Sequence, residues 1–383
     1  MQHSLLYPDY SRSIVNLANS VIAYFGAQSY HPGLAELDEA LEAGSPSGAP
    51  YKHVLVMVFD AMGSRNLQDW LPPESYLRSH QAAEITSTFP PTTTAATTTL
   101  QSGLTPSEHA WLGWRMYFEE LGANICPFMN IYDDGTRVSE KKYAREHIPY
   151  ESIYDRITQA GKAHAYAVSE YGSHHITTLN QLFDSARYLC SRDERSYIYT
   201  YWPNPDSYMH REGTCGIDAL ATVHIVNSMV AELAGQVQDT LIVVTADHGQ
   251  LDGTNESITR YPELNAYLSS APSVEPRASS FRLRAGADAA GFEAEFKKHF
   301  GNDYQLMTQD QMVESGLFGN KAVRLTDTPA EHPRFREFLG DYMGVAVGTR
   351  SLFRNDTEAR RFVGIHAGLL EKEMLVPLIL FKT

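Results

Sequence analysis

Short apolar runs recur along the chain and alternate with stretches that have the periodicity of helices. Apolar runs occupy residues 53–59, 83–86, 163–169, 197–202, 241–246 and 376–381. Helical patterns cover residues 11–25, 151–161, 217–235 and 289–300. This alternation predicts an α/β fold, with a mainly parallel sheet and helices on both of its faces. In such sheets, ligands bind beyond the carboxyl ends of the strands.

Two stretches fit this sheet poorly. Residues 114–148 mix aromatic and charged side chains, as a lid or an insertion does. Residues 252–335 combine a loop rich in Pro and Ser, at 269–280, with a small pattern of strands and helices. We therefore predict a core made of residues 1–251 and 336–383, with a lid insertion at 114–148, and a smaller cap subdomain at 252–335.

Composition narrows the class of protein and of partner. A formal net charge of −15 over 383 residues argues against nucleic acid bound along a basic face. We find no run of 18 apolar residues and no secretory signal, so we expect neither a membrane-spanning helix nor a membrane partner. Cys126, Cys190 and Cys215 are widely spaced, which predicts a reducing compartment, the cytoplasm, and no disulfide framework.

Carboxylates and imidazoles follow several of the predicted strands. Asp60 comes directly after residues 53–59, and Asp247-His248-Gly249 ends the run at 241–246. Asp206 and His210 are four residues apart, as on one face of a helix, and His366 lies between two nearby glycines. Taken singly, each segment is typical of a polar loop, a helix cap or a loop histidine. Together they offer six ligands of the kinds that bind divalent cations such as zinc.

A threonine-rich segment follows the strand predicted at 83–86. It contains Thr92, Thr93 and Thr94, which can simply cap the start of a helix. Alternatively, one of the three is a nucleophile whose hydroxyl is activated by a metal, beside a helix N-terminus that binds a phosphoryl group. Six ligands and one hydroxyl suffice for two metal ions and a nucleophile, an arrangement suited to phosphoryl transfer.

Taken in order along the chain, these segments resemble the type I phosphodiesterase/nucleotide pyrophosphatase family of the alkaline phosphatase superfamily. The resemblance rests on five motifs: VFDAMG ending the first strand, FPPTT continuing to SGLTPSEH, PDSYMH, TADHG and IHAGL. It implies an alkaline-phosphatase-like fold and a phospho-threonine intermediate on Thr93. It also implies two divalent ions, usually zinc. One would be held by Asp206, His210 and His366, and the other by Asp60, Asp247, His248 and the Thr93 oxygen.

The sequence departs from the family pattern near the expected substrate pocket. Ala95-Ala96-Thr97 stands where nucleotide pyrophosphatases often have Pro-Asn-His, and Trp114 stands where they place a phosphate-binding Asn. Trp114 and Arg115 are our candidates for substrate contacts, and Asn130 is a third candidate. We expect a small phosphate-ester substrate; phosphonate hydrolysis and phosphomonoester hydrolysis on the same metals stay open. We also leave open a non-catalytic metal-binding protein that retains the fold, the oligomeric state, and any role for His109, His174 and His175.

Overall fold

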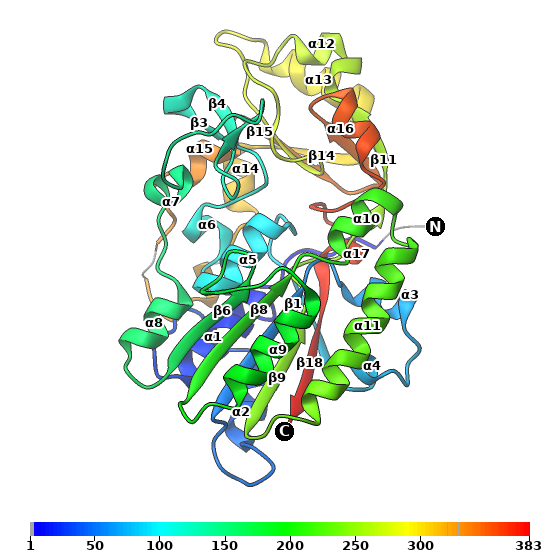
Figure 1. Cartoon of the computed structure of the whole chain (residues 1–383). Coiled ribbons are helices and arrows are strands. Elements are labelled where there is room, and N and C mark those ends of the chain that lie inside the picture. The colour runs from blue at the N-terminus through cyan, green and yellow to red at the C-terminus, as the bar shows by residue number, and fades with distance from the viewer. Residues whose placement is uncertain (1–3, 320, 328–329) are drawn as a thin grey trace.

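One seven-stranded sheet runs through the larger lobe of the molecule (Figure 1). The computed structural model describes residues 4–319, 321–327 and 330–383. The strands lie in the order β2 (Gln81–Thr86), β18 (Leu375–Lys382), β9 (Thr240–Thr245), β1 (His53–Phe59), β8 (Ser196–Trp202), β6 (His164–Ser169) and β7 (His174–His175). Each of the six longer strands overlaps one of the six apolar runs, so the predicted fold class is confirmed.

The parallel part of the sheet positions the chemistry of the chain. β1 pairs in parallel with β8 on one side and with β9 on the other, and every residue of β1 and β9 is buried. Continuous apolar runs are typical of such strands, because both faces of the sheet are covered. β18 is antiparallel to both β9 and β2. The sequence did not predict this reversal, because an apolar run carries no information on strand direction.

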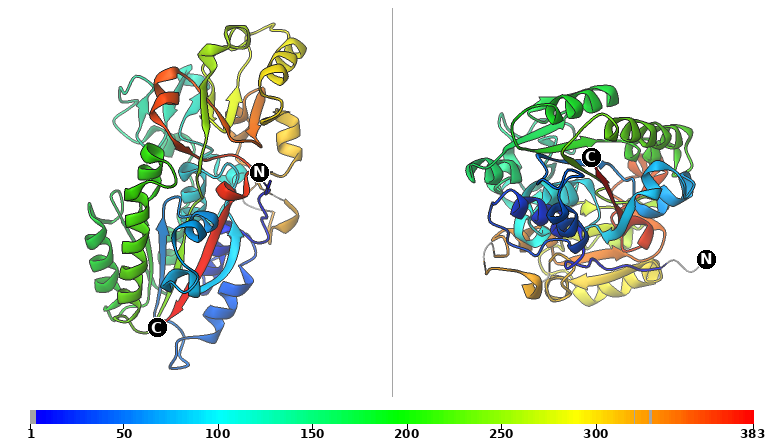
Figure 2. Two further views of the ribbon diagram at one scale, coloured as in Figure 1. Left: turned by 90° about the vertical axis from the view of Figure 1, so that its right-hand side faces the viewer. Right: turned by 90° about the horizontal axis from the view of Figure 1, so that it is seen from below.

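Helices cover both faces of this sheet (Figure 2). One layer contains α1 (Ile14–Tyr24), α2 (Ala35–Ala43), α5 (Thr93–Ser102) and α8 (Ile153–Gln159), which contact one another around α1 and α5. The other contains α3 (Ser64–Trp70), α4 (Tyr76–Ser79), α9 (Leu179–Cys190) and α11 (Ile217–Ala234). The sheet and its helices share one large apolar core.

A smaller lobe lies beyond the carboxyl ends of the parallel strands (Figures 1 and 2). Its four-stranded antiparallel sheet has the order β12 (Ser273–Glu275), β13 (Ala278–Phe281), β15 (Tyr342–Ala346) and β14 (Tyr304–Thr308). Its helices include α12 (Pro262–Asn265), α13 (Ala289–Phe300), α14 (Gln309–Glu314) and α15 (Phe335–Leu339). A boundary at 335 would separate β15 from its hydrogen-bonding partners β13 and β14. We therefore propose that the cap subdomain continues to Phe353.

Shorter elements complete the small lobe and join it to the large one. Within residues 114–148, a three-stranded antiparallel sheet is followed by a short helix: β3 (Met116–Phe118), β4 (Ala123–Cys126), β5 (Ile131–Tyr132) and α7 (Tyr143–His147). Two further strand pairs are β10 (Leu251–Asp252) with β17 (Gly364–Ile365), and β11 (Thr254–Ser257) with β16 (Arg350–Phe353), the second of which lies within the proposed cap. The remaining α-helices are α6 (Pro106–His109), α10 (Asp206–Glu212), α16 (Asp356–Arg361) and α17 (Glu371–Met374).

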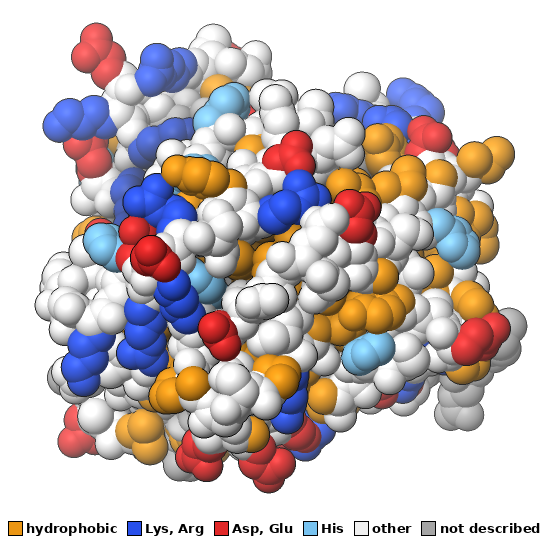
Figure 3. All heavy atoms as spheres, turned by 60° about the horizontal axis from the view of Figure 1, so that its bottom comes forward, with side chains coloured by type: hydrophobic (Ala, Val, Ile, Leu, Met, Phe, Trp, Pro, Cys, Tyr) orange, Lys and Arg blue, Asp and Glu red, His pale blue; other side chains and the backbone are white. Residues whose placement is uncertain are grey.

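The outer surface of the large lobe carries both charged and apolar side chains. Figure 3 shows acidic and basic groups interspersed on its lower face, with apolar groups gathered toward one side. Helix α11 is long and apolar enough to cross a membrane by length and composition alone, and 28% of it is buried. Core helices of soluble proteins pass the same test, and the inner face of α11, with Val223, Val226 and Val230, packs in the core of the large lobe.

Candidate active site

The predicted ligands converge where β1, β8 and β9 end. Asp60 follows β1, Asp247 and His248 follow β9, and Asp206 begins α10 after β8. Two backbone hydrogen bonds hold the loops together: Asp60 N–H donates to Trp202 O at 3.0 Å, and Asp206 N–H donates to Asp60 O at 3.1 Å. All three carboxylates are buried. The structure therefore brings Asp60 and Asp247, which are 187 positions apart in the sequence, together at one edge of the sheet.

Thr93 is the first residue of α5 and faces this cluster. Its Oγ1 lies 3.3 Å from Asp60 Oδ2 and 3.3 Å from His248 Nε2. Thr92 donates to Glu275 at 2.7 Å, whereas Thr94 is buried, with no hydrogen-bond partner among the described residues. Of the three consecutive threonines, Thr93 therefore has the hydroxyl placed to meet a group bound between the carboxylates and the helix N-terminus.

Three imidazoles present the same ring nitrogen to the site. Nδ1 of His210, His248 and His366 lies 2.8–3.0 Å from the backbone carbonyl oxygens of Gly364, Gly249 and Pro91. An Nδ1–H that donates to a carbonyl leaves Nε2 free to bind a cation. The rings of His248 and His366 also stack, with centroids 3.9 Å apart. The backbone thus orients three imidazoles toward the site before any ion binds.

Each of the three carboxylates has an oxygen that the protein leaves unpaired. Asp60 Oδ1, Asp206 Oδ1 and Asp247 Oδ2 are buried and have no hydrogen-bond partner within the described part of the chain. Imidazole nitrogens face them at longer range: His248 Nε2 is 3.4 Å from Asp60 Oδ1 and 3.6 Å from Asp247 Oδ2, and His366 Nε2 is 3.8 Å from Asp206 Oδ1. Ligands about 2.0–2.1 Å from one tetrahedral ion lie roughly 3.3 Å from each other. The donor set therefore fits divalent cations.

Two overlapping groups of three ligand atoms are close enough to share an ion. One group is Asp60, Asp247 and His248, and the other is Asp206, His248 and His366. His210 stands beside the second group, with its Nε2 3.3 Å from Asp206 Oδ2. His248 therefore lies between the two groups, whereas the family resemblance assigned it to one ion only.

The buried carboxylates of the cluster need compensating positive charge. Burial, together with the charges of Asp247 and Asp206, raises the pKa of Asp60 well above its ordinary value, and burial likewise raises the pKa of Asp247. Burial also opposes ionisation of Asp206, but His210 outweighs it and lowers the pKa of this carboxyl. Like-charged carboxylates in a buried site cannot all ionise without a compensating cation. Bound cations would supply that compensation.

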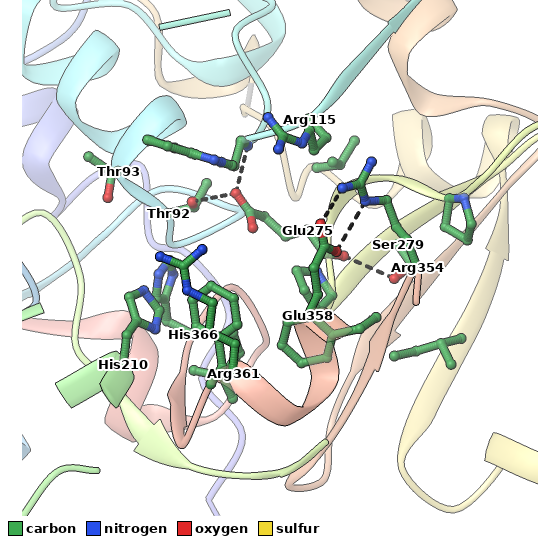
Figure 4. A pocket seen from close by; sticks show the side chains of 18 of the residues that line it. Thr92, Thr93, Arg115, His210, Glu275, Ser279, Arg354, Glu358, Arg361 and His366 are labelled. Atoms are coloured by element: carbon green, nitrogen blue, oxygen red, sulfur yellow. Dashed lines mark hydrogen bonds and ion pairs between the residues drawn. The ribbon is translucent and has the colours of Figure 1, made fainter. Parts of the chain in front are cut away.

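A cavity of about 470 Å³ opens from this cluster toward the small lobe. Thr93, Asp206, His210 and His366 line it on the side of the large lobe. Its other wall comes from three segments of the cap side: residues 114–115, residues 272–279 and residues 352–362. Figure 4 shows the labelled side chains of both walls pointing into the shared space. The geometry suits a small ligand held between an ion-binding floor and a polar roof.

Comparison with known proteins identifies the family. Residues 54–366 match the family described as type I phosphodiesterase/nucleotide pyrophosphatase. The chain belongs to this family. Its members are phosphoric ester hydrolases, so the predicted enzyme class is confirmed. In sequence, the chain matches none of the curated proteins.

Solved structures of low sequence identity share the fold of this family member. One is murine ectonucleotide pyrophosphatase/phosphodiesterase 5, as an inactive Thr-to-Ala variant with AMP: 15% identity, TM-score 0.62, covering 85% of this chain and 87% of that one. Another is phosphonoacetate hydrolase from Sinorhizobium meliloti 1021 with phosphonoformate: 15% identity, TM-score 0.63, covering 88% and 93%. At such identity the likeness confirms the alkaline-phosphatase-like architecture and no more.

The glycines of two motifs are explained by close packing rather than by sharp turns. A Cβ on Gly249 would lie 2.1 Å from Lys372 O, so the chain after His248 has no room for a side chain. A Cβ on Gly368 would lie 2.8 Å from a guanidinium nitrogen of Arg277. Arg277 is fully buried and forms an ion pair with Glu373, which also accepts from Gly368 N–H at 2.7 Å. This pair links the cap to the loop that carries His366.

Two of the three candidates for substrate contact line the cavity, and the third does not. Trp114 lines the cavity and is 40% exposed, and Arg115 also lines it. Asn130 is instead a buried structural residue, because its amide donates to Ser139 O and Lys141 O at 2.8 Å.

The unassigned histidines lie outside the cavity lining. His109 is buried, with its Nε2 3.1 Å from Thr99 Oγ1, and burial with the nearby His332 lowers its pKa to about 3. His174 and His175 form β7, at the edge of the central sheet.

Sequence reasoning missed three residues around the site. Tyr201, in β8, donates its hydroxyl hydrogen bond to Asp60 Oδ2. Glu275 accepts from Thr92 Oγ1 and from Trp114 N–H, both at 2.7 Å, and so joins the cap to the start of α5. Arg361 lines the cavity from the end of α16. The signal for Glu275 was two nearby prolines, Pro272 and Pro276, and they indicated a loop.

Proposed function

We propose that this protein is a metal-dependent phosphodiesterase or nucleotide pyrophosphatase that uses Thr93 as its nucleophile and two divalent cations, with zinc the expected metal. The observation that carries the proposal is the set of three buried, unpaired carboxylate oxygens facing imidazole Nε2 atoms, directly beside the Thr93 hydroxyl. The proposed ligands are Asp60, Asp206, His210, Asp247, His248 and His366.

The reaction would proceed in two displacements at phosphorus. Thr93 Oγ1 attacks, its proton passes to solvent, an O–P bond forms, and the first alcohol leaves with the ester oxygen. Water then attacks the phospho-threonine, which regenerates the hydroxyl and releases the phosphorylated product. Bound cations would lower the pKa of the attacking hydroxyl or water and would stabilise charge on the non-bridging oxygens.

The residues of the chain would perform the remaining tasks. The N-terminus of α5 directs backbone N–H groups toward the bound phosphoryl group. Tyr201 holds Asp60 in place, and the carbonyls of Gly364, Gly249 and Pro91 hold the three imidazoles. The cap wall excludes bulk water and surrounds the part of the substrate that does not react.

Two of the structural relatives support the proposal and its closest alternative. The mouse enzyme is inactive when a threonine is replaced by alanine, and it binds AMP, which supports a threonine nucleophile. The bacterial relative is a phosphonoacetate hydrolase, so phosphonate hydrolysis is our second candidate, and it is favoured by Trp114 where nucleotide pyrophosphatases place Asn. Phosphomonoester hydrolysis and a non-catalytic metal-binding role rank below these. The cytoplasmic location stays a prediction.

A substrate panel tests the proposal. Purified, metal-analysed protein would be assayed on aryl phosphodiesters, aryl phosphomonoesters and phosphonates, with and without a chelator. We expect diester turnover that the chelator abolishes and that Thr93→Ala abolishes while its metal content stays near native. Thr94→Ala is the matched control, because that hydroxyl has no hydrogen-bond partner among the described residues, whereas Thr93 Oγ1 lies beside Asp60. Failure to turn over any substrate with any divalent metal contradicts the proposal.

Metal analysis of a second variant tests the ligands. His366→Ala should lower the bound metal below about two equivalents, as a two-ion site requires. An unchanged metal content would remove His366 from the ligand set.

A further inference from the structure

Four arginines line the cavity, and three of them have carboxylate partners. Arg115 Nε lies 3.1 Å from Asp133 Oδ1, and Arg354 forms ion pairs with Asp133 and Glu358. Arg211 lies 3.7 Å from Glu212 and 3.8 Å from Asp218. The charges of these three side chains are therefore compensated within the protein.

Arg361 is the fourth, and it has no such partner. Within the described residues it forms no ion pair and no hydrogen bond, and its guanidinium carbon lies 5.9 Å from the centre of the Phe362 ring. A basic side chain without an acidic partner is unexpected in this chain, because it has 46 acidic and only 31 basic residues. A guanidinium presents a planar set of donors that matches a carboxylate or a phosphate.

The position of Arg361 places these donors next to the candidate metal site. Arg361 ends α16, and the following Phe362 packs edge-on against His210, with ring centroids 4.8 Å apart. Figure 4 shows the Arg361 side chain extending into the cavity toward His210 and His366. The two carboxylates on the cap side of the cavity are engaged elsewhere: Glu358 with Arg354, and Glu275 with Thr92 and Trp114. The third carboxylate of the lining, Asp206, is a proposed metal ligand.

We propose that Arg361 binds a second anionic group of the substrate, one that is not the phosphorus undergoing attack. The inference rests on the proposed function, which places the reacting phosphoryl group at Thr93. The substrate class is then a phosphate ester that carries a carboxylate a few bonds from the scissile phosphorus. Arg361 determines specificity by favouring such substrates over neutral ones of the same shape.

A pair of matched substrates tests this assignment. One is 4-nitrophenyl 2-carboxyethyl phosphate, and the other is its carboxamide, which has the same shape without the second charge. Release of 4-nitrophenolate reports kcat/KM for both. We expect the metal-loaded enzyme to prefer the carboxylate by about 10- to 100-fold, the range for a charged hydrogen-bonded contact.

Three arginine variants distinguish a specific contact from a general effect of charge. Arg361→Gln should remove the preference by lowering kcat/KM for the carboxylate alone. Arg360→Gln removes the same charge one residue away, outside the cavity lining, and Arg211→Gln removes a compensated charge inside it. Both should keep the preference. Because Arg361 has no partner to lose, its variant should unfold at the native temperature.

The possible failures can be told apart. Equal turnover of the two substrates by the native enzyme overturns the inference and leaves the proposed function standing. An equal loss on both substrates in Arg361→Gln also overturns it, because Arg361 would then contact the reacting phosphoryl group. Loss of the preference in either control assigns it to general charge and overturns it as well. Absence of turnover with either substrate contradicts the proposed function, and with it the inference.

Discussion

Replacing Glu275 should separate the need for a hydrogen-bond acceptor from the need for a charge. Its Oε1 accepts from the Thr92 hydroxyl and the Trp114 N–H, and Thr92 is 1% exposed. Glu275→Ala leaves both donors without their acceptor. Glu275→Gln retains an oxygen of the same shape in the same place. The two variants should therefore differ strongly in stability.

The expected magnitudes follow from the burial of these donors. A buried donor left without an acceptor costs about 1–3 kcal/mol, so Glu275→Ala should lower the free energy of unfolding by about 2–4 kcal/mol. Glu275→Gln should stay within about 1 kcal/mol of the native protein at neutral pH. Burial raises the pKa of Glu275, so the folded state resists its ionisation. Native stability then falls as pH rises from the ordinary carboxyl pKa to the raised one, and Glu275→Gln lacks that part of the fall.

Urea unfolding, followed at several pH values, measures these differences. A double variant with Thr92→Val provides the control, because it removes one of the stranded donors. Glu275→Ala combined with Thr92→Val should therefore cost less than the sum of the two single changes. If Glu275→Gln destabilises the protein as much as Glu275→Ala, the charge and not the acceptor stabilises this contact, and the reasoning is wrong.

Two further predictions concern the metal ligands. Tyr201→Phe should weaken metal binding about 10- to 100-fold by freeing Asp60, whereas Tyr199→Phe on the same strand should not, because the Tyr199 hydroxyl has no hydrogen-bond partner in the described structure. Competition with a chromophoric chelator measures both affinities, and equal effects would contradict the role of Tyr201. Metal affinity should also fall as pH drops. Burial lowers the pKa of His210, but Asp206 outweighs this effect and raises the pKa. Burial and the nearby carboxylates raise the pKa of Asp60, so protons compete with the metal for both residues. The same competition assay at pH 8 and pH 6 would refute this if the affinity stayed constant.

The sequence predicted the site better than it predicted the cavity around it. Asp60 and Asp247 directly follow apolar strands, and the carboxyl ends of adjacent parallel strands must meet, so local pattern was enough to bring them together. His366 was harder to place by pattern alone, because its loop is held by the Arg277–Glu373 pair, which joins residues 96 positions apart. For that residue the family resemblance contributed what the local pattern did not.

The cap wall could not be predicted for a physical reason. Glu275 joins the site through the donors of Thr92 and Trp114, which are 183 and 161 positions away in the sequence, so neither contact is local. Arg361 ends a charged, half-exposed helix whose pattern is that of a solvated surface. Its relation to the cavity depends on Phe362 packing against His210. The cap boundary at 335 stays a prediction, and our proposed extension to Phe353 rests on strand pairing with β15, which leaves no local signal.

The most direct test of the account is to find the phosphoryl group on the enzyme. The metal-loaded protein would be quenched in acid during the burst of 4-nitrophenolate release from an aryl phosphodiester, digested, and mapped by mass spectrometry. We predict a covalent phosphoryl adduct on Thr93, in the peptide that begins α5, and none in Thr93→Ala. An adduct on Thr92 or Thr94, or a full burst with no adduct on the protein, would contradict the central claim.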